Sequence, residues 1–383
     1  MTHPNQLSVF HLRTSILIGG VETVLGDWVQ HFGTEGIHSR LCCFRNSSGS
    51  EQAFIDYLDQ HAIPVTMVPW GRRKSVLAAV RMLVSEIKAA QGPVVINSHD
   101  VRARLVANVV AFRTKIPHIA SMHAWHNVPG KVRFLEAIDA RLLRHVDILV
   151  NCSEATRLGS IARGIAPEKT TTIYNGLDFA PFQIPTDRLA WRRRYGLNPD
   201  DYVVGNVARL YPEKGQINLL EAAAMLRAKF PRLRIIIFGD GPERAGLEAA
   251  RQNLNLTDIV SMPGFEPDFP GMLSMFDAFA LPSLAEGTPQ VIIGAMARAL
   301  PIVACPVDGV AEALSDNVSA LFVPPGNSAA LANAIEKLMN QPELARRLAQ
   351  QAHADGLSRF AVSATARQYA EVYRRLLAES ARS

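Results

Sequence analysis

Short apolar, β-branched segments alternate with longer helix-like segments along the whole of this 383-residue chain. They fall into two successive groups, each of about six segments, one in each half of the sequence. Apolar strands separated by helices are typical of parallel sheets that are covered on both faces. Two such groups predict an α/β protein built from two doubly wound domains.

The individual elements follow from this alternation. We expect strands at residues 8–12, 40–44, 65–69, 94–98, 118–123, 147–152, 171–174, 202–208, 233–239, 260–264, 278–283, 301–306 and 320–323. Helical spacing of apolar residues predicts helices that include 21–32, 219–230, 290–299 and 328–339, and a last one at 362–377 with Tyr369, Val372, Tyr373 and Leu376 on one face. The prolines and basic residues of 175–194 predict a linker between the domains.

Composition narrows the class of protein. Apolar residues make up 48% of the chain and charged residues 20%, so we expect packed cores rather than disorder. No run of about 18 apolar residues occurs, and the start of the chain lacks the pattern of a secretory signal, so we expect neither a spanning helix nor export. Four cysteines without metal-ligand spacing are typical of a reduced, cytoplasmic setting.

The positive charge is confined to the first half of the chain. Residues 1–180 hold 19 Lys and Arg against 14 Asp and Glu, whereas residues 181–383 hold 21 of each. This excess indicates either a solvated basic surface or attraction to anionic lipid or a phosphate-bearing acceptor. Nucleic acid is disfavoured, because no basic stripe interleaved with aromatic residues is present.

Glycines and cations follow two of the predicted strands, where ligands of open α/β sheets bind. Gly19 and Gly20 precede a helix, either as a phosphate-binding turn or as a tight turn without a ligand. Arg209 and Lys214 follow the strand 202–208. They either hold a diphosphate from two sides or are ordinary surface cations.

Other strand ends carry turns and a carboxylate. The sequence Gly-Asp-Gly-Pro at 239–242 predicts a turn that opens a helix, with Asp240 as its cap. Gly264 would let a ligand approach the backbone closely. Glu286 either binds sugar hydroxyls and stabilises positive charge on a sugar ring, or is a carboxylate satisfied by a helix N-terminus.

Histidines also lie at strand ends. His123 ends the strand 118–123, and His99 and His126 occupy similar places. Each is either a catalytic group or a packed or surface side chain. A dinucleotide-dependent oxidoreductase is disfavoured, because the fingerprint G-x-G-x-x-G is absent.

Taken together, these motifs resemble the retaining glycosyltransferases of family four, and the resemblance covers nearly the whole chain. The motifs that carry it are Gly19–Glu22, Arg209 with Lys214-Gly215, Phe238–Pro242, Pro282-Ser283, Glu286–Pro289, Ala295–Ala297, Pro301–Ala304, Asp308–Glu312 and Leu321–Pro324. Their order and spacing are more specific than any one of them.

The resemblance implies the GT-B fold, with two Rossmann-like domains facing across a cleft that closes when the donor binds. The acceptor-binding domain would be 1–178, the nucleotide-sugar domain 179–360, and a helix at 361–383 would pack back on the first domain. The activity would be that of a hexosyltransferase, moving a hexose from a UDP- or GDP-linked donor to a glycan or lipid-linked glycan acceptor by a front-face path. No metal or other cofactor would be needed. Polysaccharide, exopolysaccharide or lipopolysaccharide synthesis, with peripheral contact at the inner membrane, would be the setting.

The resemblance also assigns roles to residues. Arg209 and Lys214 would bind the donor diphosphate, Glu286 the sugar hydroxyls, and His123 would hydrogen-bond at the sugar and the acceptor. The donor site as a whole would comprise Gly19, Gly20, Arg209, Lys214, Gly239, Gly264, Phe265, Glu286, Gly287, Thr288, Pro289 and Gly294.

One position departs from the family pattern. The second of two glutamates separated by seven residues, which normally holds the ribose hydroxyls, is replaced by Gly294. Ala299 and Asp308 also stand where the family usually has glycine. Three explanations stay open: a weakened enzyme, a subfamily that binds ribose differently, or a deliberate substitution. The alternative function that this position supports is a catalytically silent sugar-nucleotide-binding or partner protein on the same scaffold.

Overall fold

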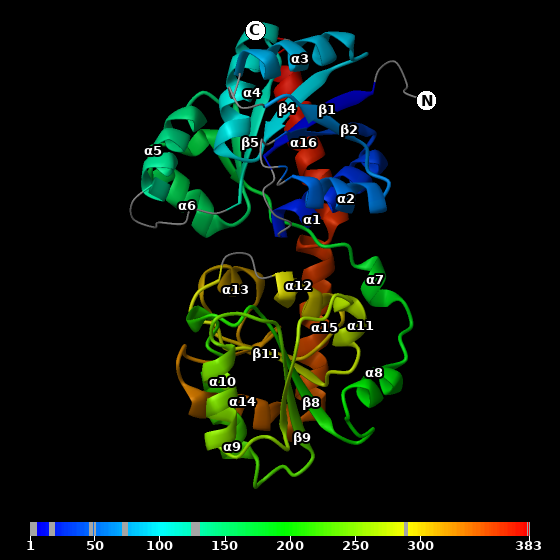
Figure 1. Ribbon diagram of the computed structural model, residues 1–383, viewed down its shortest axis with the longest axis vertical. Coiled ribbons are helices and arrows are strands. Elements are labelled where there is room, and N and C mark those ends of the chain that lie inside the picture. Colours follow the sequence, from blue (N-terminus) through cyan, green and yellow to red (C-terminus); the bar gives the residue numbers. More distant parts are fainter. Residues whose placement is uncertain are drawn as a thin grey trace. The chain divides into compact units, whose positions relative to one another are not determined.

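The protein is described here by a computed structural model that covers residues 6–14, 20–45, 49, 51–70, 76–123, 131–286, 290–380 and 382, without the side chains of 20–24, 53 and 131–133. The chain forms two compact units (Figure 1). Unit 1 is Met1–Gly176 together with Val362–Ser383, and unit 2 is Leu177–Ala361. The chain therefore leaves unit 1 at Gly176, inside the predicted linker, and returns at Val362.

Unit 1 contains a seven-stranded sheet in which every pairing is parallel. Its strands are β1 (Leu7–Arg13), β2 (Ile37–Phe44), β3 (Val65–Val68), β4 (Val94–Ser98), β5 (His118–Met122), β6 (Ile148–Asn151) and β7 (Thr170–Thr172). The order is β3-β2-β1-β4-β5-β6-β7. The order reverses direction between β1 and β4, which is where a doubly wound sheet binds its ligands.

Helices cover both faces of this sheet, and β1 shows why. Alternate side chains of a strand point to opposite faces. Val9 belongs to one buried cluster with Trp28 of α1, while Phe10 belongs to another with residues of α3 and α4. The helices are α1 (Gly20–Phe32), α2 (Gln52–Gln60), α3 (Val76–Ala89), α4 (Val101–Thr114), α5 (Lys131–Leu143), α6 (Glu154–Ala162) and α16 (Val362–Ser380).

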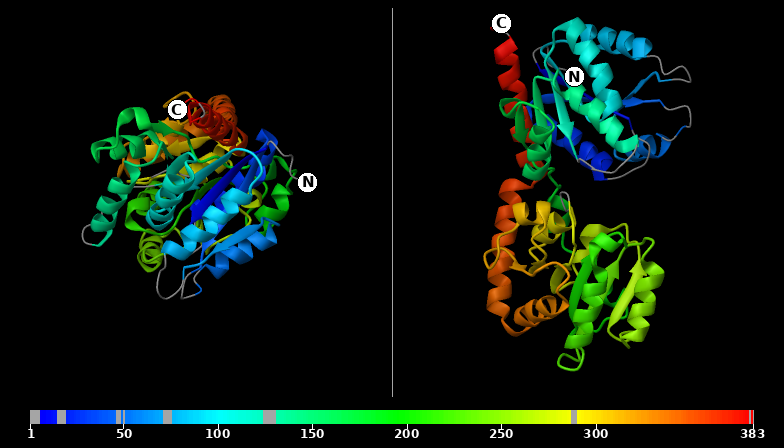
Figure 2. Two further views of the ribbon diagram at one scale, coloured as in Figure 1. Left: turned by 90° about the horizontal axis from the view of Figure 1, so that it is seen from above. Right: turned by 90° about the vertical axis from the view of Figure 1, so that its left-hand side faces the viewer.

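Helix α16, far away in sequence, completes the core of unit 1 (Figure 2, red). Three of the four residues predicted to share a face, Tyr369, Tyr373 and Leu376, are buried there, and Val372 packs against them in part. The Tyr369 hydroxyl lies 2.9 Å from Ser121 Oγ, and the amide of Asn97 donates to the Tyr373 hydroxyl at 3.0 Å. Buried hydroxyls that find partners in this way fix the helix on the sheet.

The chain enters and leaves unit 1 at one spot. A Cβ on Gly176 would lie 2.6 Å from Val362 Cα and 2.5 Å from Thr365 Oγ1. Thr365 Oγ1 in turn donates to the carbonyl of Tyr174 at 2.9 Å. Only glycine allows the outgoing strand of chain to pass the first turn of α16 this closely.

Unit 2 contains a six-stranded sheet, again parallel throughout. Its strands are β8 (Tyr202–Val207), β9 (Leu233–Phe238), β10 (Val260–Gly264), β11 (Ala278–Leu281), β12 (Ile302–Ala304) and β13 (Leu321–Phe322), in the order β10-β9-β8-β11-β12-β13. Its helices are α7 (Ala180–Gln183), α8 (Arg188–Arg194), α9 (Gln216–Leu226), α10 (Arg244–Asn253), α11 (Phe269–Leu273), α12 (Gln290–Ala297), α13 (Asp308–Ala313), α14 (Ser328–Asn340) and α15 (Pro342–Arg359). The reversal of order falls between β8 and β11.

All thirteen predicted strands are present, so the two-domain α/β prediction is confirmed. The predicted linker is wrong for 188–194, which form α8 within unit 2. Arg192 is only 2% exposed, and its guanidinium donates to the Met275 carbonyl and to Asp277 Oδ2, the latter at 2.7 Å. A buried arginine with all these acceptors is part of a core, although its sequence neighbourhood looks like a solvated linker.

Two further observations concern membrane-spanning helices and the cysteines. Among the described residues, no helix is both long and apolar enough to cross a membrane. All four cysteines are buried, and none of them forms a disulfide bond.

Candidate functional site

The sequence-predicted residues of unit 2 gather where β8 and β11 end. Lys214 lies in the turn after β8, and Glu286 lies in the loop after β11. Lys214 Nζ is 2.8 Å from Glu286 Oε1, and the two side chains are 14% and 8% exposed. Ser283 Oγ donates to the same carboxylate oxygen at 2.6 Å. The structure thus brings together two predicted residues that are 72 positions apart in the chain.

The two loops are held together by their backbones. Gly215 has φ +63°, and a Cβ there would lie 2.3 Å from the carbonyl oxygen of Pro282. The amide of Leu284 donates to the Glu213 carbonyl at 2.7 Å. Glycine is required at such a turn because other residues pay for a positive φ and have no room for a side chain. This packing places the Lys214 ammonium beside Glu286.

Arg209 lies in the same region as Lys214, but it is more exposed to solvent. Its side chain is exposed, and its guanidinium lies 4.9 Å from the ring centroid of Tyr211. It forms no ion pair with a carboxylate in the described part of the chain, whereas Lys214 does. A guanidinium on an aromatic face keeps its charge and its donors for an incoming anion.

The turn after β9 packs closely against the backbone that follows β8. Gly239 has φ +129°, and a Cβ there would lie 1.9 Å from the carbonyl oxygen of Ala208. The prediction that Asp240 caps the next helix is wrong. The N-cap of α10 is Glu243, without a side-chain bond, while Asp240 accepts from the amide of Gly241 at 2.8 Å and pairs with Arg244 at 2.9 Å.

The end of β10 combines an open backbone with an exposed aromatic side chain. Gly264 has φ +100°, and a Cβ there would meet only Arg244, at 3.7 Å. Phe265, next to it, is 78% exposed. A phenyl ring held out at a strand end, beside an open backbone, can stack on a planar ring such as a nucleobase.

Gly294 is buried in α12, and its surroundings differ from those of an open ribose site. A Cβ there would lie 2.4 Å from two ring atoms of Phe269 and 3.4 Å from Leu273 Cδ1. The Phe269 ring is in turn packed edge-on against Phe182, with centroids 5.7 Å apart. The space that a side chain at 294 would need is therefore filled by an aromatic ring.

Asp308, which replaces a family glycine, keeps a glycine-like conformation. Its φ is +37°, and one carboxylate oxygen accepts from the Glu286 amide at 3.3 Å. A non-glycine residue with positive φ is strained, and such strain is concentrated at functional sites. Sequence spacing did not mark either Asp308 or Ser283 as a partner of Glu286. Four predicted donor-site residues, Gly19, Gly287, Thr288 and Pro289, lie outside the described residues, and Gly20 begins α1.

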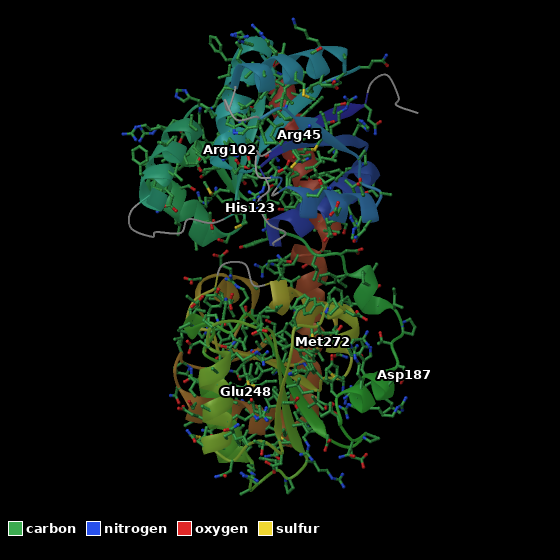
Figure 3. The ribbon with its side chains drawn as sticks, viewed as in Figure 1. Arg45, Arg102, His123, Asp187, Glu248 and Met272 are labelled. Atoms are coloured by element: carbon green, nitrogen blue, oxygen red, sulfur yellow. The ribbon has the colours of Figure 1, made fainter. Side chains whose placement is uncertain are left out.

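In unit 1, His123 follows β5 at the edge where the strands end (Figure 3). It belongs to a row of three histidines that the sequence did not show. His123 Nε2 is 3.3 Å from His99 Nδ1, and His99 Nε2 is 3.2 Å from His11 Nδ1. Since His11 lies in β1 and His99 follows β4, this row spans the reversal point of the first sheet.

His11 and His99 are buried and His123 is partly buried, and the resulting loss of solvation keeps the row neutral. Loss of solvation lowers the pKa of both His11 and His123 from 6.5 to about 3. Burial also lowers the pKa of His99, and its two histidine neighbours and Arg13 and Arg104 add to the effect. A charged imidazole would lose its hydration without gaining an anionic partner.

Asp100, which follows His99 in the chain, has a structural role. It is the N-cap of α4, where it accepts from the amides of Arg102 and Ala103. It also accepts from the amide of Thr14 at 2.6 Å. The Asp100 carboxylate is therefore satisfied by backbone amides.

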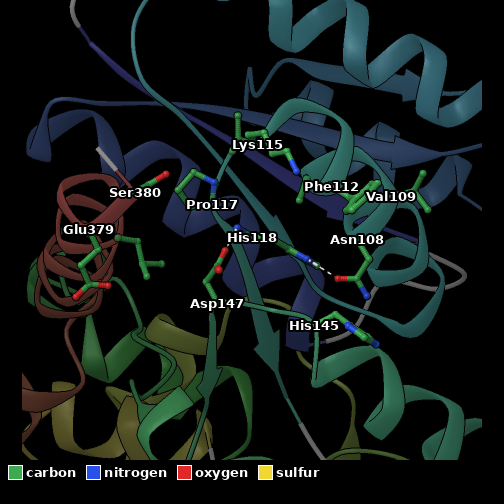
Figure 4. Close-up of a pocket in the computed structure, with 13 residues that line it drawn as sticks. Asn108, Val109, Phe112, Lys115, Pro117, His118, His145, Asp147, Glu379 and Ser380 are labelled. Carbon is green, nitrogen blue, oxygen red and sulfur yellow. Dashed lines mark hydrogen bonds between the residues drawn. The ribbon is translucent and has the colours of Figure 1, made fainter. Parts of the chain in front are cut away.

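A cavity of unit 1 lies at the opposite ends of the strands (Figure 4). Its volume is about 1050 Å³, and Asn108, Phe112, His118 and Asp147 are among its lining residues. His118, at the start of β5, bonds to Asn108 Oδ1 and Ser98 Oγ, each at 2.9 Å. Because ligands of doubly wound sheets bind at the carboxyl ends, this cavity does not coincide with the predicted chemistry. The described residues contain no cluster of three or more His, Cys, Asp or Glu that could hold a metal ion.

Comparison with known proteins agrees with the fold. The family model of glycosyl transferases group 1 matches residues 187–355, and that of Glycosyltransferase Family 4 matches residues 18–180. HepE from Anabaena, crystallised with UDP, superimposes with a TM-score of 0.81 at 24% identity, over 97% of this chain and all of that one. A glycosyltransferase from Rickettsia africae gives 0.82 at 17% identity, over 97% and 99%. The two family models and the fold together define a GT-B glycosyltransferase.

Proteins with related sequences identify the family within this class. D-inositol 3-phosphate glycosyltransferase of Stackebrandtia nassauensis is 32% identical over 347 residues, 83% of this chain and 76% of that protein. Putative glycosyltransferase EpsD of Bacillus subtilis is 28% identical over 84% of this chain and 86% of that one. Alpha-D-kanosaminyltransferase of Streptomyces kanamyceticus is 35% identical, over 49% of each chain. The chain belongs to the group 1 glycosyltransferases of family 4, which transfer sugars from nucleotide-sugar donors.

Proposed function

We propose that this protein is a retaining hexosyltransferase that uses a UDP- or GDP-linked donor and a glycan or lipid-linked glycan acceptor, without a metal or other cofactor. The observation that carries the proposal is the meeting of Lys214 and Glu286 at the reversal point of unit 2. A neighbour of known structure was crystallised with UDP-glucose, and a relative 24% identical is named as a galactosyltransferase acting on a diphosphoundecaprenol-linked sugar.

Arg209 and Lys214 would bind the donor diphosphate. Negative charge develops on the β-phosphate as the bond from the sugar C1 to the phosphate oxygen breaks. Two cations fixed at that position stabilise this charge more than the ground state, which lowers the barrier. In a front-face reaction the acceptor oxygen bonds to C1 on the same face, and its proton passes to the leaving phosphate oxygen. The nucleoside diphosphate then leaves.

Glu286 would exchange part of its contact with Lys214 for hydroxyls of the donor sugar. The carboxylate has four lone-pair sites, so it can keep the Ser283 bond and still accept from the sugar. Phe265 would lie against the nucleobase, and His123 would hydrogen-bond at the reacting sugar. Gly239 and Gly264 would keep the backbone close to the nucleotide.

Position 294 is a glycine, and the Phe269 ring fills the space beside it. The ribose must therefore be held without a carboxylate from this position. Either other groups bind the ribose, or the donor binds weakly. The alternative function, a sugar-nucleotide-binding or partner protein without turnover, rests on this one position. Retention of Lys214, Glu286 and Arg209 supports the active enzyme.

A donor screen tests the proposal. Thermal shift with UDP, GDP and their hexose conjugates is followed by donor hydrolysis and by transfer to lipid-linked glycans, each with and without a chelator. We expect one base to stabilise the protein, turnover with one sugar, and no loss of rate on chelation.

The matched control is Lys229→Ala, since Lys229 is also a unit 2 lysine paired with a glutamate, Glu336, but on the surface. Stabilisation and turnover should survive Lys229→Ala and be lost in Lys214→Ala. Binding without turnover by any donor or acceptor would favour the silent scaffold. A rate that disappears on chelation would contradict metal independence.

We also propose peripheral contact of unit 1 with anionic lipid at the inner membrane face. Unit 1 carries 23 Lys and Arg against 15 Asp and Glu. Phe112 on α4 and Phe134 on α5 are exposed, and basic residues such as Arg113, Lys115 and Arg141 lie on the same two helices or just after them. Exposed aromatic and basic side chains together bind the interfacial region of anionic membranes.

Vesicle sedimentation tests this contact. We expect binding to vesicles with phosphatidylglycerol, weaker binding at high salt, and none to purely zwitterionic vesicles. The double variant Phe112→Ser/Phe134→Ser should bind less, while Phe230→Ser on unit 2 should not change binding. Equal binding to both kinds of vesicle would refute the electrostatic part of the proposal.

A further inference from the structure

The row His11–His99–His123 contains two histidines to which the reaction assigns nothing. We propose that His11 and His99 are positioning residues, which fix His123 as a neutral imidazole whose Nδ1–H is the free donor at the end of the row. This inference rests on the proposed function for the use of that donor, but not for the existence of the row.

The geometry makes the three rings one hydrogen-bonded unit. The nitrogen separations are 3.2 and 3.3 Å, and successive rings are tilted by only 24° and 25° with centroids 5.5 Å apart. A neutral imidazole has one N–H and one lone pair. Each link needs one of each, so all three rings must carry their protons on the same kind of nitrogen.

The direction of the row follows from its inner end. His11 Nε2 is buried, and no described residue bonds to it. The His11 ring is stacked on Phe32, with centroids 5.5 Å apart and an angle of 14°. Unsatisfied buried N–H groups are rarer than unsatisfied acceptors. One end of the row must carry an N–H without a partner inside the protein, and only the His123 end lies at the strand edge, where a bound ligand could accept from it. The lone pair therefore belongs on His11 Nε2, and the proton on Nδ1.

The outer end then has a defined character. His11 donates to His99, His99 donates to His123 Nε2, and Nδ1 of His123 carries the remaining proton. That atom is buried and has no partner among the described residues. The neighbouring chain is fixed as well, because Cys152 Sγ donates to the His123 carbonyl at 3.0 Å. A donor held in this way would bond an oxygen of the donor sugar or of the leaving group.

The surroundings keep a proton from being added to the row. Trp28 has its ring centroid 6.2 Å from that of His99 and 6.3 Å from that of His123. Arg13 donates to the His99 carbonyl at 3.1 Å, and its charge, like that of Arg104, opposes a second positive charge. Two carboxylates of unit 1, Asp100 and Asp139, are engaged elsewhere, Asp100 at the start of α4 and Asp139 with Arg104.

Nitrogen-15 NMR of the histidine rings in the full-length protein tests the row without any substrate, because the two tautomers differ in the shifts of Nδ1 and Nε2. We expect His11, His99 and His123 to be neutral between pH 6 and 8, and all three to carry the proton on Nδ1. A proton on Nε2 of His123, or a mixture of both forms, overturns the proposal, whatever the activity is.

A variant separates positioning from mere packing. His11→Leu removes the first donor without changing a group in hydrogen-bond contact with His123, and we expect the His123 signal to shift toward a mixture of tautomers. The expected fall in kcat is about threefold to tenfold, with KM almost unchanged. His11→Phe is the second variant, should leucine destabilise the fold.

His118→Gln is the matched control, because His118 is equally buried on β5 but bonds to Ser98 and Asn108 (Figure 4). We expect it to leave the His123 signal and kcat as in the wild type. Equal effects of the His11 and His118 variants on that signal contradict the proposal. If no donor is turned over at all, the proposed function fails, while the ring spectra still decide the row.

Discussion

The two units share one strand topology but place opposite chemistry at its reversal point. Unit 1 is the basic unit, yet its reversal point holds three neutral imidazoles. Unit 2 has 17 Lys and Arg against 20 Asp and Glu, yet its reversal point holds Arg209 and Lys214. The net charge of a domain therefore does not determine the charge at its site, which depends on the few residues that follow the central strands.

Burial explains why the two sites differ in ionisation. The histidines lie among Trp28, Phe32 and Tyr369, where an isolated charge has no compensation. Lys214 is nearly as buried, but it has Glu286 at 2.8 Å. A buried pair stays charged only when each ion has a partner, and removing one partner strands the other.

The largest effect should come from breaking the charged site. Lys214→Ala removes a stabilising cation from the leaving diphosphate and leaves Glu286 without its counter-ion. We expect kcat to fall by roughly 10²–10³-fold, the range seen for one lost donor at a developing negative charge. Steady-state kinetics with the identified donor measure it. A loss no larger than that of Lys229→Ala would mean that Lys214 does not act on the diphosphate.

The next largest effect should come from placing a second carboxylate at position 294 of unit 2. Gly294→Glu must displace the Phe269 ring, so we expect the free energy of unfolding to drop by about 1–3 kcal/mol. Combining it with Phe269→Ala opens the space and should recover part of that loss, and the double variant should bind the nucleotide more tightly than Phe269→Ala alone. Urea unfolding and calorimetric titration measure both. Gly294→Glu with wild-type stability would refute the packing argument.

The pH dependence of the unfolding free energy tests the neutral histidines of unit 1. The folded-state pKa of His11 is about 3, below the unfolded value of 6.5, so the unfolded chain binds the extra proton in that window. Stability should therefore fall as the pH drops below about 6.5, by up to about 1.4 kcal/mol per pH unit for each such histidine. His11→Leu should reduce this slope by about that amount. Urea unfolding at pH 7, 6 and 5 gives the slope.

The smallest effect concerns the helix that closes unit 1. Tyr369→Phe removes one buried hydroxyl and its contact with Ser121. We expect a loss of about 0.5–1.5 kcal/mol of unfolding free energy. The activity should be unchanged, because the rings around the histidine row keep their packing. A loss of activity larger than the loss of stability would connect α16 directly to the chemistry.

The sequence predicted single elements better than it predicted the contacts between them. Strand positions followed from local apolar runs, and Lys214 and Glu286 were each recognisable at a strand end. Their pairing depends on β8 lying beside β11, which no local pattern contains. His11 was missed because it is one polar residue within a mostly apolar strand. The Phe269 ring over Gly294, and the burial of Arg192, depend likewise on contacts between distant elements.

The close passage of Gly176 beside Val362 has a consequence for how the protein is made. Unit 2 is inserted between two parts of unit 1, so α16 leaves the ribosome only after all of unit 2 has emerged. Until then the surface of Trp28 and Phe32 that α16 covers remains uncovered. Unit 2 can therefore fold first, although it is encoded second, and unit 1 is completed by a helix that is synthesised after all of unit 2.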